Sequence, residues 1–184
     1  GKRLDGALQV ARRNMLGVGS TLEGLDVIQF PYEYVFDKVW THSDKGDQQW
    51  IDELADRHAG FVSPSVRRAW QILFNEIFVQ VPGTYSILPC RSPMLNDNHS
   101  ERTEIKYPAQ HLEEAWSLLL DVPKCENNAL QIDLIAVGRQ VLGNKFLTVK
   151  SEFDAAYATK DLPLLKHKAY EMEELLSDLD CLTS

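Results

Sequence analysis

The chain has 184 residues, of which 44% are hydrophobic, and carries a formal net charge of −8 at pH 7. That length and apolar content are enough for a buried core, so we expect one domain with at most an attached piece, not a disordered chain. The acidic balance disfavours nucleic acid and anionic membranes as main partners, because both require a basic surface. No apolar run approaches the ~20 residues of a transmembrane helix, and the first residues lack the apolar centre of a signal peptide. The chain is therefore either cytosolic or has lost its original N-terminus.

The first expected element is a short strand at residues 14–19. This run is apolar, contains glycine, and has no neighbouring segment that could pair with it, so we expect the last strand of a sheet whose other strands lie outside this chain. Glu23 follows the strand, and a helix is expected to open on Pro31. Barrel enzymes hold catalytic side chains where a strand end leads through a loop into a helix, which makes Glu23 a candidate catalytic residue.

From residue 30 onward the chain is predicted to be almost entirely helical. Apolar residues recur at helical spacing, prolines stand at first helical positions, and glycine or proline marks several ends. We expect Ser63 to cap the third helix and Asp161 the last one. A long loop without sustained periodicity, residues 83–107, is rich in proline, asparagine and serine, and loops of this length are often functional. The expected helices cover residues 31–40, 47–60, 63–82, 108–123, 127–157 and 161 onward.

The apolar stripes of these helices predict how they pack. The helix at 127–157 carries two stripes, so it should be central, whereas the last helix has one stripe and should pack on the outside. No repeat of 34 or 40 residues is present, which favours an irregular helical bundle over a solenoid. The stripes are Tyr32, Val35, Phe36, Val39 and Trp40; Leu130, Leu134, Val137 and Val141 with Ile135, Leu142, Phe146, Val149, Phe153 and Tyr157; and Leu162, Leu165, Ala169, Met172, Leu176 and Leu179.

Several common site motifs are excluded. A dinucleotide loop built on Gly17 and Gly19 would need a third glycine where Leu22 stands, and no GK[ST] follows for a phosphate loop. The serines lack a G-x-S-x-G elbow. The three cysteines, 90, 125 and 181, form neither a disulfide framework nor a CxxC motif. The histidines, at 42, 58, 99, 111 and 167, never fall in a metal-ligand spacing, so we expect surface or packing roles and no metal site.

Two charged residues of the central helix need separate partners. Asp133 and Arg139 are six positions apart, or about 600° of rotation, so they point roughly 120° from each other and cannot pair. Both adjoin apolar stripes, where an unpaired charge is costly. We expect Arg139 to bond loop carbonyls or a carboxylate of another element.

A family resemblance runs along the chain. Leu22-Glu23-Gly24-Leu25, followed by Tyr32 and Trp40, resembles the P-E-G-I segment of the alpha-N-acetylglucosaminidases, family 89 of the glycoside hydrolases. The similarity covers nearly the whole chain in the right order. Ala69-Trp70 and Ala115-Trp116 resemble the family's two A-W-x-L-L helices, Arg91-Ser92-Pro93 its R-S-P loop, and Asp133-Leu134 with Arg139-Gln140 its Y-D-L-x-D-x-x-R-Q helix.

The resemblance implies a fold and an activity. Residues 1–45 would be the C-terminal end of a TIM-like barrel and residues 46–184 an incomplete α-helical C-terminal domain, so the expected fold is mainly α, with an irregular helical bundle preceded by the terminal piece of a (β/α) barrel. The parent would be a retaining exo-glycosidase that removes terminal alpha-linked N-acetylglucosamine from glycans such as heparan sulfate. It would need no cofactor and no metal.

The resemblance also implies residue roles. Glu23 would be the nucleophile, and Tyr32 and Arg91 would bind substrate. The acid/base glutamate of the family lies upstream, outside this chain, so the chain by itself would be inactive. The implied partners are a glycan and the barrel domain of the same polypeptide, a homo-oligomer is left open, and the implied location is lysosomal, secreted or periplasmic.

Departures from the family pattern keep two alternatives open. Leu22, Ile28, Ile132 and Ala136 replace a proline, an asparagine, a tyrosine and an aspartate of the family's motifs. One alternative is a catalytically degenerate relative that binds sugar without cleaving it. The other is a non-catalytic helical interaction module.

Overall fold

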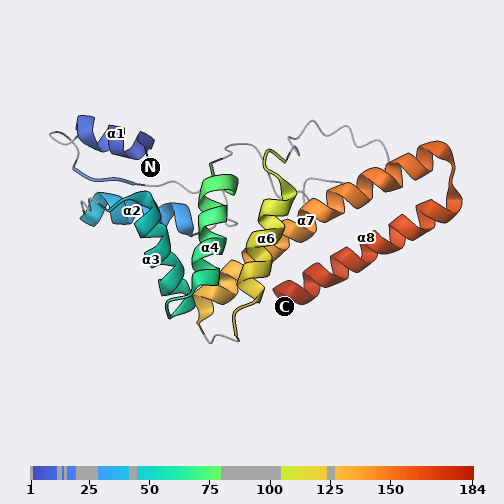
Figure 1. Ribbon diagram of the computed structural model, residues 1–184. Coiled ribbons are helices and arrows are strands. Elements are labelled where there is room, and N and C mark those ends of the chain that lie inside the picture. Colours follow the sequence, from blue (N-terminus) through green and yellow to red (C-terminus); the bar gives the residue numbers. More distant parts are fainter. Residues whose placement is uncertain are drawn as a thin grey trace. The chain divides into compact units, whose positions relative to one another are not determined.

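The computed structural model of the chain describes residues 2–11, 14, 16–19, 29–41, 45–79, 105–123 and 127–184. These residues divide into two compact units, Gly1–Trp50 and Ile51–Ser184, with the boundary inside α3. Within the described part no helix is long and apolar enough to span a membrane. The elements are α1 Lys2–Ala11, α2 Phe30–Thr41, α3 Asp47–Ala59, α4 Pro64–Ile72, the π-helical turn η1 Leu73–Ile77, α6 Ala109–Leu120, α7 Asn128–Thr159 and α8 Leu162–Thr183 (Figure 1).

The helical part of the fold prediction is confirmed, and the strand is not seen. Seven α-helices and no strand occur among the described residues. In the segment expected as the strand, residue 14 lies in a turn and residues 16–19 have no regular structure. A strand is stable only when neighbouring strands satisfy its backbone groups, and the described residues offer it none.

The predicted helix ends follow from local chemistry and are confirmed. The Oγ of Ser63 accepts the backbone N–H of Val66 at 3.3 Å, and a carboxylate oxygen of Asp161 accepts that of Leu164 at 3.1 Å. Both side chains thereby satisfy donors that the first helical turn leaves without a partner. Gly60 ends α3 with φ of 80°, a left-handed conformation that glycine adopts without strain.

The third helix departs from the expected single α-helix over residues 63–82. After Ile72 the backbone widens into η1, and the N–H of Phe78 bonds the carbonyl of Leu73 five residues earlier, at 2.8 Å. Leu73 and Ile77 are both buried. The structure shows no local sequence signal for this widening, which the sequence therefore did not predict.

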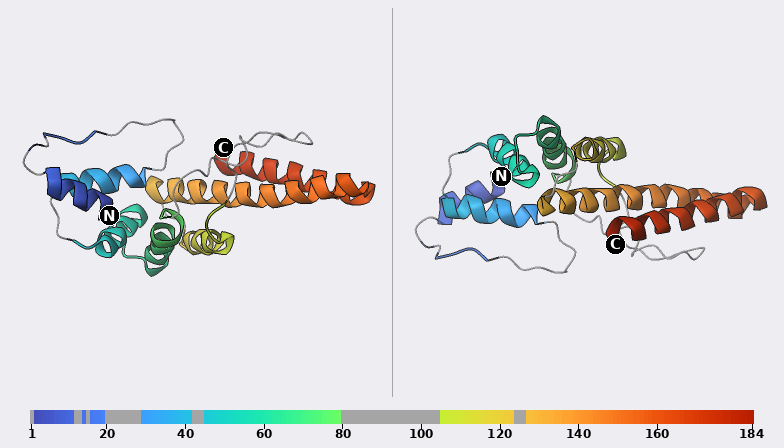
Figure 2. Two further views of the ribbon diagram at one scale, coloured as in Figure 1. Left: turned by 90° about the horizontal axis from the view of Figure 1, so that it is seen from above. Right: turned by 90° about the horizontal axis from the view of Figure 1, so that it is seen from below.

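The predicted central position of α7 is confirmed. Its first half lies against α6, its second half forms an antiparallel hairpin with α8, and α4 packs beside α6 (Figure 1, Figure 2). The first predicted stripe buries Leu130 and Val137, and the second buries Phe146 and Val149. A helix that contacts elements on both of these sides needs apolar residues over a wide arc, which is what the two stripes provide.

The last helix packs on the outside as predicted, and its buried face includes most of the predicted stripe: Met172 is buried, and Leu165, Ala169 and Leu179 are half-buried. Met172 and Leu175 are buried against α7, although Leu175 was not part of the predicted stripe. Leu162 and Leu176 belong to the predicted stripe but are 57% and 50% exposed. Among the described elements α8 makes its extensive contacts with α7 alone, so it buries a narrow face, and the direction of that face is set by its one neighbour.

The crossing of α6 and α7 depends on the absence of a side chain at Gly138. A Cβ atom at this position would lie 2.8 to 3.0 Å from three atoms of the Trp116 indole ring. The indole N–H is buried there and has no hydrogen-bond partner among the described residues. By contrast, a Cβ atom at Gly143, also in α7, would meet nothing within 4 Å.

We therefore predict opposite effects for two identical substitutions in one helix. Gly143→Ala should raise the free energy of unfolding by up to about 1 kcal/mol, because alanine has the higher helix propensity and the site has room. Gly138→Ala should lower it by about 1 kcal/mol or more, since overpacking against Trp116 outweighs the propensity gain. Urea unfolding of both variants tests this, and a stabilised Gly138→Ala would contradict the close packing.

Candidate functional site

The structure describes one of the three predicted site residues. Glu23 and Arg91 lie outside the described residues. Tyr32 lies in the first turns of α2 and is half-buried. The candidate site is therefore built here from Tyr32 and from the contacts that hold its helix.

The two faces of α2 differ in what they contact. Successive residues of a helix are rotated by about 100°, so Phe30 and Tyr34 share one face. Tyr32 points about 200° away from Tyr34. It lies on the opposite face, together with Phe36 and Trp40. Phe30 and Tyr34 are each only 5% exposed, whereas Phe36 is 42% and Trp40 87% exposed. The predicted apolar stripe is therefore not the buried face of this helix: Phe36 and Trp40 of the stripe are exposed, and its other members are half-buried.

Trp50, the last residue of the first unit, explains why the other face is buried. Its ring lies 6.2 Å from that of Phe30 and 5.0 Å, edge to face, from that of Tyr34. Its indole N–H donates to Asp37 of α2, and the hydroxyl of Tyr34 donates to Asp47 of α3 at 2.7 Å. Aromatic packing and two reciprocal hydrogen bonds therefore join α2 to the start of α3.

Lys38 completes this contact. Its ammonium group lies 2.9 Å from a carboxylate oxygen of Asp47, 3.8 Å from one of Asp5 in α1, and 5.5 Å from the centre of the Tyr34 ring. A cation held between a carboxylate and an aromatic face gains from both. We call the following set the α2 anchor: Phe30, Tyr34, Asp37, Lys38, Asp47 and Trp50.

The electrostatics of the anchor keep its groups in their bonded protonation states. Burial alone would raise the pKa of Asp47, but hydrogen bonds from Lys38 and Tyr34 more than offset it and hold the pKa below the ordinary value. Burial and the bond to Asp47 raise the pKa of Tyr34, and the bond to Asp47 raises that of Lys38. At neutral pH the carboxylate is therefore charged and both donors keep their protons.

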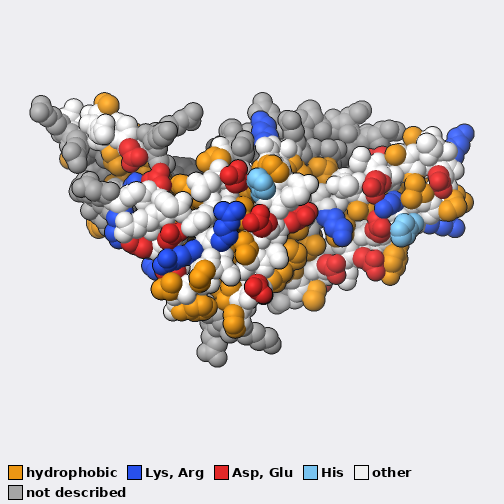
Figure 3. All heavy atoms as spheres, viewed as in Figure 1, with side chains coloured by type: hydrophobic (Ala, Val, Ile, Leu, Met, Phe, Trp, Pro, Cys, Tyr) orange, Lys and Arg blue, Asp and Glu red, His pale blue; other side chains and the backbone are white. Residues whose placement is uncertain are grey.

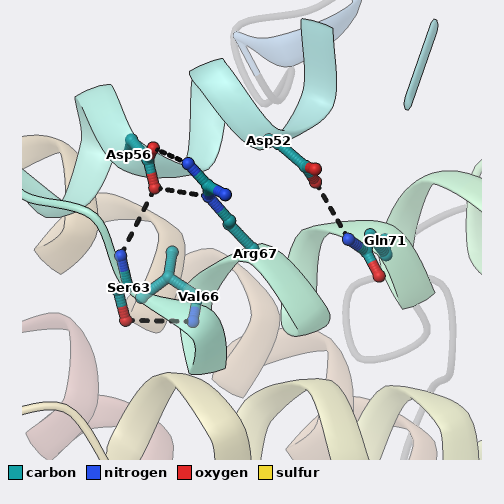
Figure 4. Close-up of polar contacts among 6 residues, drawn as sticks. All are labelled: Asp52, Asp56, Ser63, Val66, Arg67 and Gln71. Atoms are coloured by element: carbon teal, nitrogen blue, oxygen red, sulfur yellow. Dashed lines mark hydrogen bonds and ion pairs between the residues drawn. The ribbon is translucent and has the colours of Figure 1, made fainter. Parts of the chain in front are cut away.

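A second polar contact holds the corner between α3 and α4 (Figure 4). The guanidinium of Arg67 donates to both carboxylate oxygens of Asp56, with Nε 2.9 Å from Oδ1. Asp56 also accepts a hydrogen bond from the backbone N–H of Ser63 at 3.3 Å. The bond from Arg67 holds the pKa of Asp56 below its ordinary value. One turn further on, the side-chain amide of Gln71 donates to Asp52 at 2.9 Å. The two carboxylates of α3 thereby set the position of α4.

A third polar contact is buried in the second unit. Nδ1 of His58 lies 2.6 Å from Oδ2 of Asp133, and the Trp70 indole N–H donates to the same oxygen at 3.2 Å. All three residues are less than a tenth exposed. An ionised carboxylate can only accept, so with Asp133 ionised the proton of this contact is on Nδ1 of His58. The expected partner for Asp133 is thus confirmed, and the half-buried Arg139 also has a partner.

These polar contacts hold helices together; they do not present a reactive group. Asp37, Asp47, Asp52, Asp56 and Asp133 each accept from a side-chain donor of another residue. No group of three or more His, Cys, Asp or Glu side chains in the described part could hold a metal ion. On the face shown in Figure 3, acidic and basic side chains are interspersed over α4, α6 and the α7–α8 hairpin. Within each unit these contacts fix how neighbouring helices meet, and we call the helices of the second unit the frame.

Sequence reasoning missed the α2 anchor. A signal was available, because Phe30 and Tyr34 are four residues apart, as are neighbours on one helix face. The predicted stripe on the other side of the helix contains more apolar residues, which hides this signal. What decided between the faces is the position of Trp50 and Asp47, which belong to the next helix, α3.

The comparisons with known proteins agree with this frame. A family model described as the alpha-N-acetylglucosaminidase (NAGLU) C-terminal domain matches residues 50–184. Among solved structures, CpGH89 from Clostridium perfringens, in complex with its substrate GlcNAc-alpha-1,4-galactose, matches with a TM-score of 0.77 and 19% identity over 92% of this chain. The match covers 20% of the CpGH89 chain. A search of curated proteins finds no match.

The buried carboxylate generates a stability prediction. Asp133→Ala should lower the free energy of unfolding by about 3 kcal/mol or more, because it leaves the His58 and Trp70 donors buried without their acceptor. Glu152→Ala in the same helix is the matched control: it removes an exposed partner of Lys168 and should cost less than about 1 kcal/mol. Chemical unfolding of both variants gives the comparison, and equal losses would contradict the role of Asp133.

The lowered pKa of Asp47 generates a pH prediction. A carboxyl group with a depressed folded-state pKa contributes stability above its unfolded pKa of about 3.9, and this contribution is lost as the pH falls through the folded value. The unmodified chain should therefore lose more unfolding free energy than Asp47→Asn between about pH 5 and about pH 2. Urea unfolding across this range tests it, with Asp178→Asn on exposed α8 as the control. Parallel curves for the unmodified chain and Asp47→Asn would count against the anchor.

Proposed function

The chain belongs to the family of alpha-N-acetylglucosaminidase (NAGLU) C-terminal domains, and on that ground we propose that it is part of a retaining exo-glycosidase. The proposed reaction removes terminal alpha-linked N-acetylglucosamine from glycans such as heparan sulfate. The family match over residues 50–184 is the observation that carries this proposal. CpGH89, whose helical fold this chain shares, is bound to a substrate with an alpha-linked GlcNAc, which supports the same linkage here.

The activity belongs to a longer polypeptide in this proposal. The chain spans 20% of the length of the CpGH89 chain it matches. Retaining glycosidases need two carboxyl groups about 5 Å apart, one to attack the anomeric carbon and one to protonate the leaving oxygen and later activate water. In the family that this chain resembles, the acid/base glutamate lies upstream of the segment that contains Glu23. We therefore assign the acid/base to a part of the polypeptide outside residues 1–184.

Glu23 is the proposed nucleophile. Its carboxylate would attack the anomeric carbon while the acid/base protonates the departing oxygen, giving a covalent glycosyl-enzyme that water then hydrolyses. Glu23 precedes α2 and lies before the matched region 50–184. The proposal for this residue rests on its resemblance to the P-E-G-I glutamate of the family.

Tyr32 and Arg91 are the proposed substrate-binding residues. Tyr32 is on the face of α2 that points away from the α2 anchor, and it is half-buried. For Arg91 an anchoring role in its own loop ranks before a contact with an anionic group of a sulfated substrate. A planar guanidinium suits either role, because it offers several fixed donors.

The location and the alternatives follow from the same resemblance. We propose a lysosomal, secreted or periplasmic location, where such glycans are degraded. Only the departures from the family's motifs favour a degenerate sugar-binding relative over the active enzyme. Two of these departures lie on α7, where Ile132 is 52% exposed and Ala136 is half-buried. The degenerate relative would bind the sugar without hydrolysing it. A helical interaction module would neither bind nor hydrolyse the sugar.

The nucleophile proposal has a direct test. Glu23→Gln in the full-length protein keeps the side-chain shape but removes the attacking charge, so hydrolysis of an aryl alpha-N-acetylglucosaminide should fall on the order of a thousandfold or more. Glu113→Gln, at an exposed carboxylate of α6, should keep the unmodified rate. The 184-residue chain alone should show no hydrolysis, because one carboxylate cannot both attack and protonate. Unmodified turnover in Glu23→Gln would overturn the assignment.

A further inference from the structure

The α2 anchor and Tyr32 lie on opposite faces of one short helix. Phe30 and Tyr34 are buried against Trp50, and Tyr32 points about 200° away from Tyr34. A helix of 12 residues is a stiff element, so a shift of the buried face moves the opposite face with it. The contacts of the α2 anchor therefore help to set the position of Tyr32, although Tyr32 is not part of the anchor.

The anchor is built more specifically than apolar packing alone requires. Tyr34 donates to Asp47 at 2.7 Å, Lys38 lies 2.9 Å from the same carboxylate, and the Trp50 indole donates to Asp37. Hydrogen bonds to charged groups are directional and strong, so they select one rotation and one translation of α2 against α3. A purely apolar contact between the same rings would tolerate sliding.

We propose that Tyr34, Asp47, Asp37 and Trp50 are positioning residues that hold Tyr32 at the sugar. This inference rests on the proposed function and adds to it the residues that orient one of its substrate contacts. Binding groups must be held closely in place, because a misplacement of about 1 Å by a change far from the chemistry can cost as much as a hundredfold in rate. The directional bonds of the anchor provide such control.

The primary test uses three substitutions in the full-length protein, with an aryl alpha-N-acetylglucosaminide as substrate. Asp47→Ala removes the acceptor of Tyr34 and should lower kcat/KM by about tenfold to a hundredfold. Asp47→Asn keeps an acceptor of the same shape and should recover most of that loss. Tyr34→Phe keeps the ring packing while removing the donor, so it provides the same test if Asp47→Ala fails to fold.

A matched control separates positioning from general loss of stability. Asp52→Ala lies on the same helix, α3, and removes the acceptor of Gln71 in α4. It should leave kcat and KM unchanged at a thermal shift comparable to that of Asp47→Ala. A loss of activity in Asp52→Ala as large as in Asp47→Ala, at equal thermal shifts, would overturn the proposal.

A double-mutant cycle shows whether the anchor acts through Tyr32. If it does, Tyr34→Phe should cost much less in kcat/KM when Tyr32 is already replaced by alanine than it costs alone. Additive losses would overturn the inference even when Glu23→Gln is inactive. Failure of the proposed function is separately visible, because Glu23→Gln would then keep unmodified turnover whatever the cycle shows.

Discussion

The structure of the second unit depends on one buried carboxylate. Asp133 lies on α7, is 7% exposed, and accepts from His58 of α3 and Trp70 of α4. A buried charge is tolerated only when its surroundings satisfy it, so these three helices must meet at this point and in this orientation. Apolar surfaces alone could pack in several neighbouring registers. The directional hydrogen bonds of the Asp133 carboxylate favour the one register in which His58 and Trp70 both reach it.

The two tryptophans that carry much of the family resemblance in this region contact the same helix. Trp70 donates to Asp133, and Trp116 covers Gly138 about one and a half turns further along α7. These motif residues therefore build the fold. Their presence supports membership in the family and the shape of the frame, whereas the proposed chemistry rests on residues before α2.

The first unit holds the helix that follows the proposed nucleophile. α2 begins seven residues after Glu23 and carries Tyr32, and its buried face is bonded to the start of α3. In this arrangement a short helix carries the proposed substrate contact, Tyr32, on one side and bonded donors and acceptors on the other. The active groups of an enzyme need such support, because precise placement accounts for a large share of catalysis.

The sequence by itself determined the features that arise within a few residues: the caps at Ser63 and Asp161, the stop at Gly60 and the two-sided apolar pattern of α7. Only the tertiary structure decided which face of α2 is buried, how far α8 is rotated, and where α4 widens into η1. A helix with aromatic residues on two sides has no local preference between them, so its partners in the fold, here Trp50 and Asp47, decide which side is buried. The partners of Asp133, 63 and 75 residues distant in the chain, were likewise set by packing, because no spacing rule links residues that far apart.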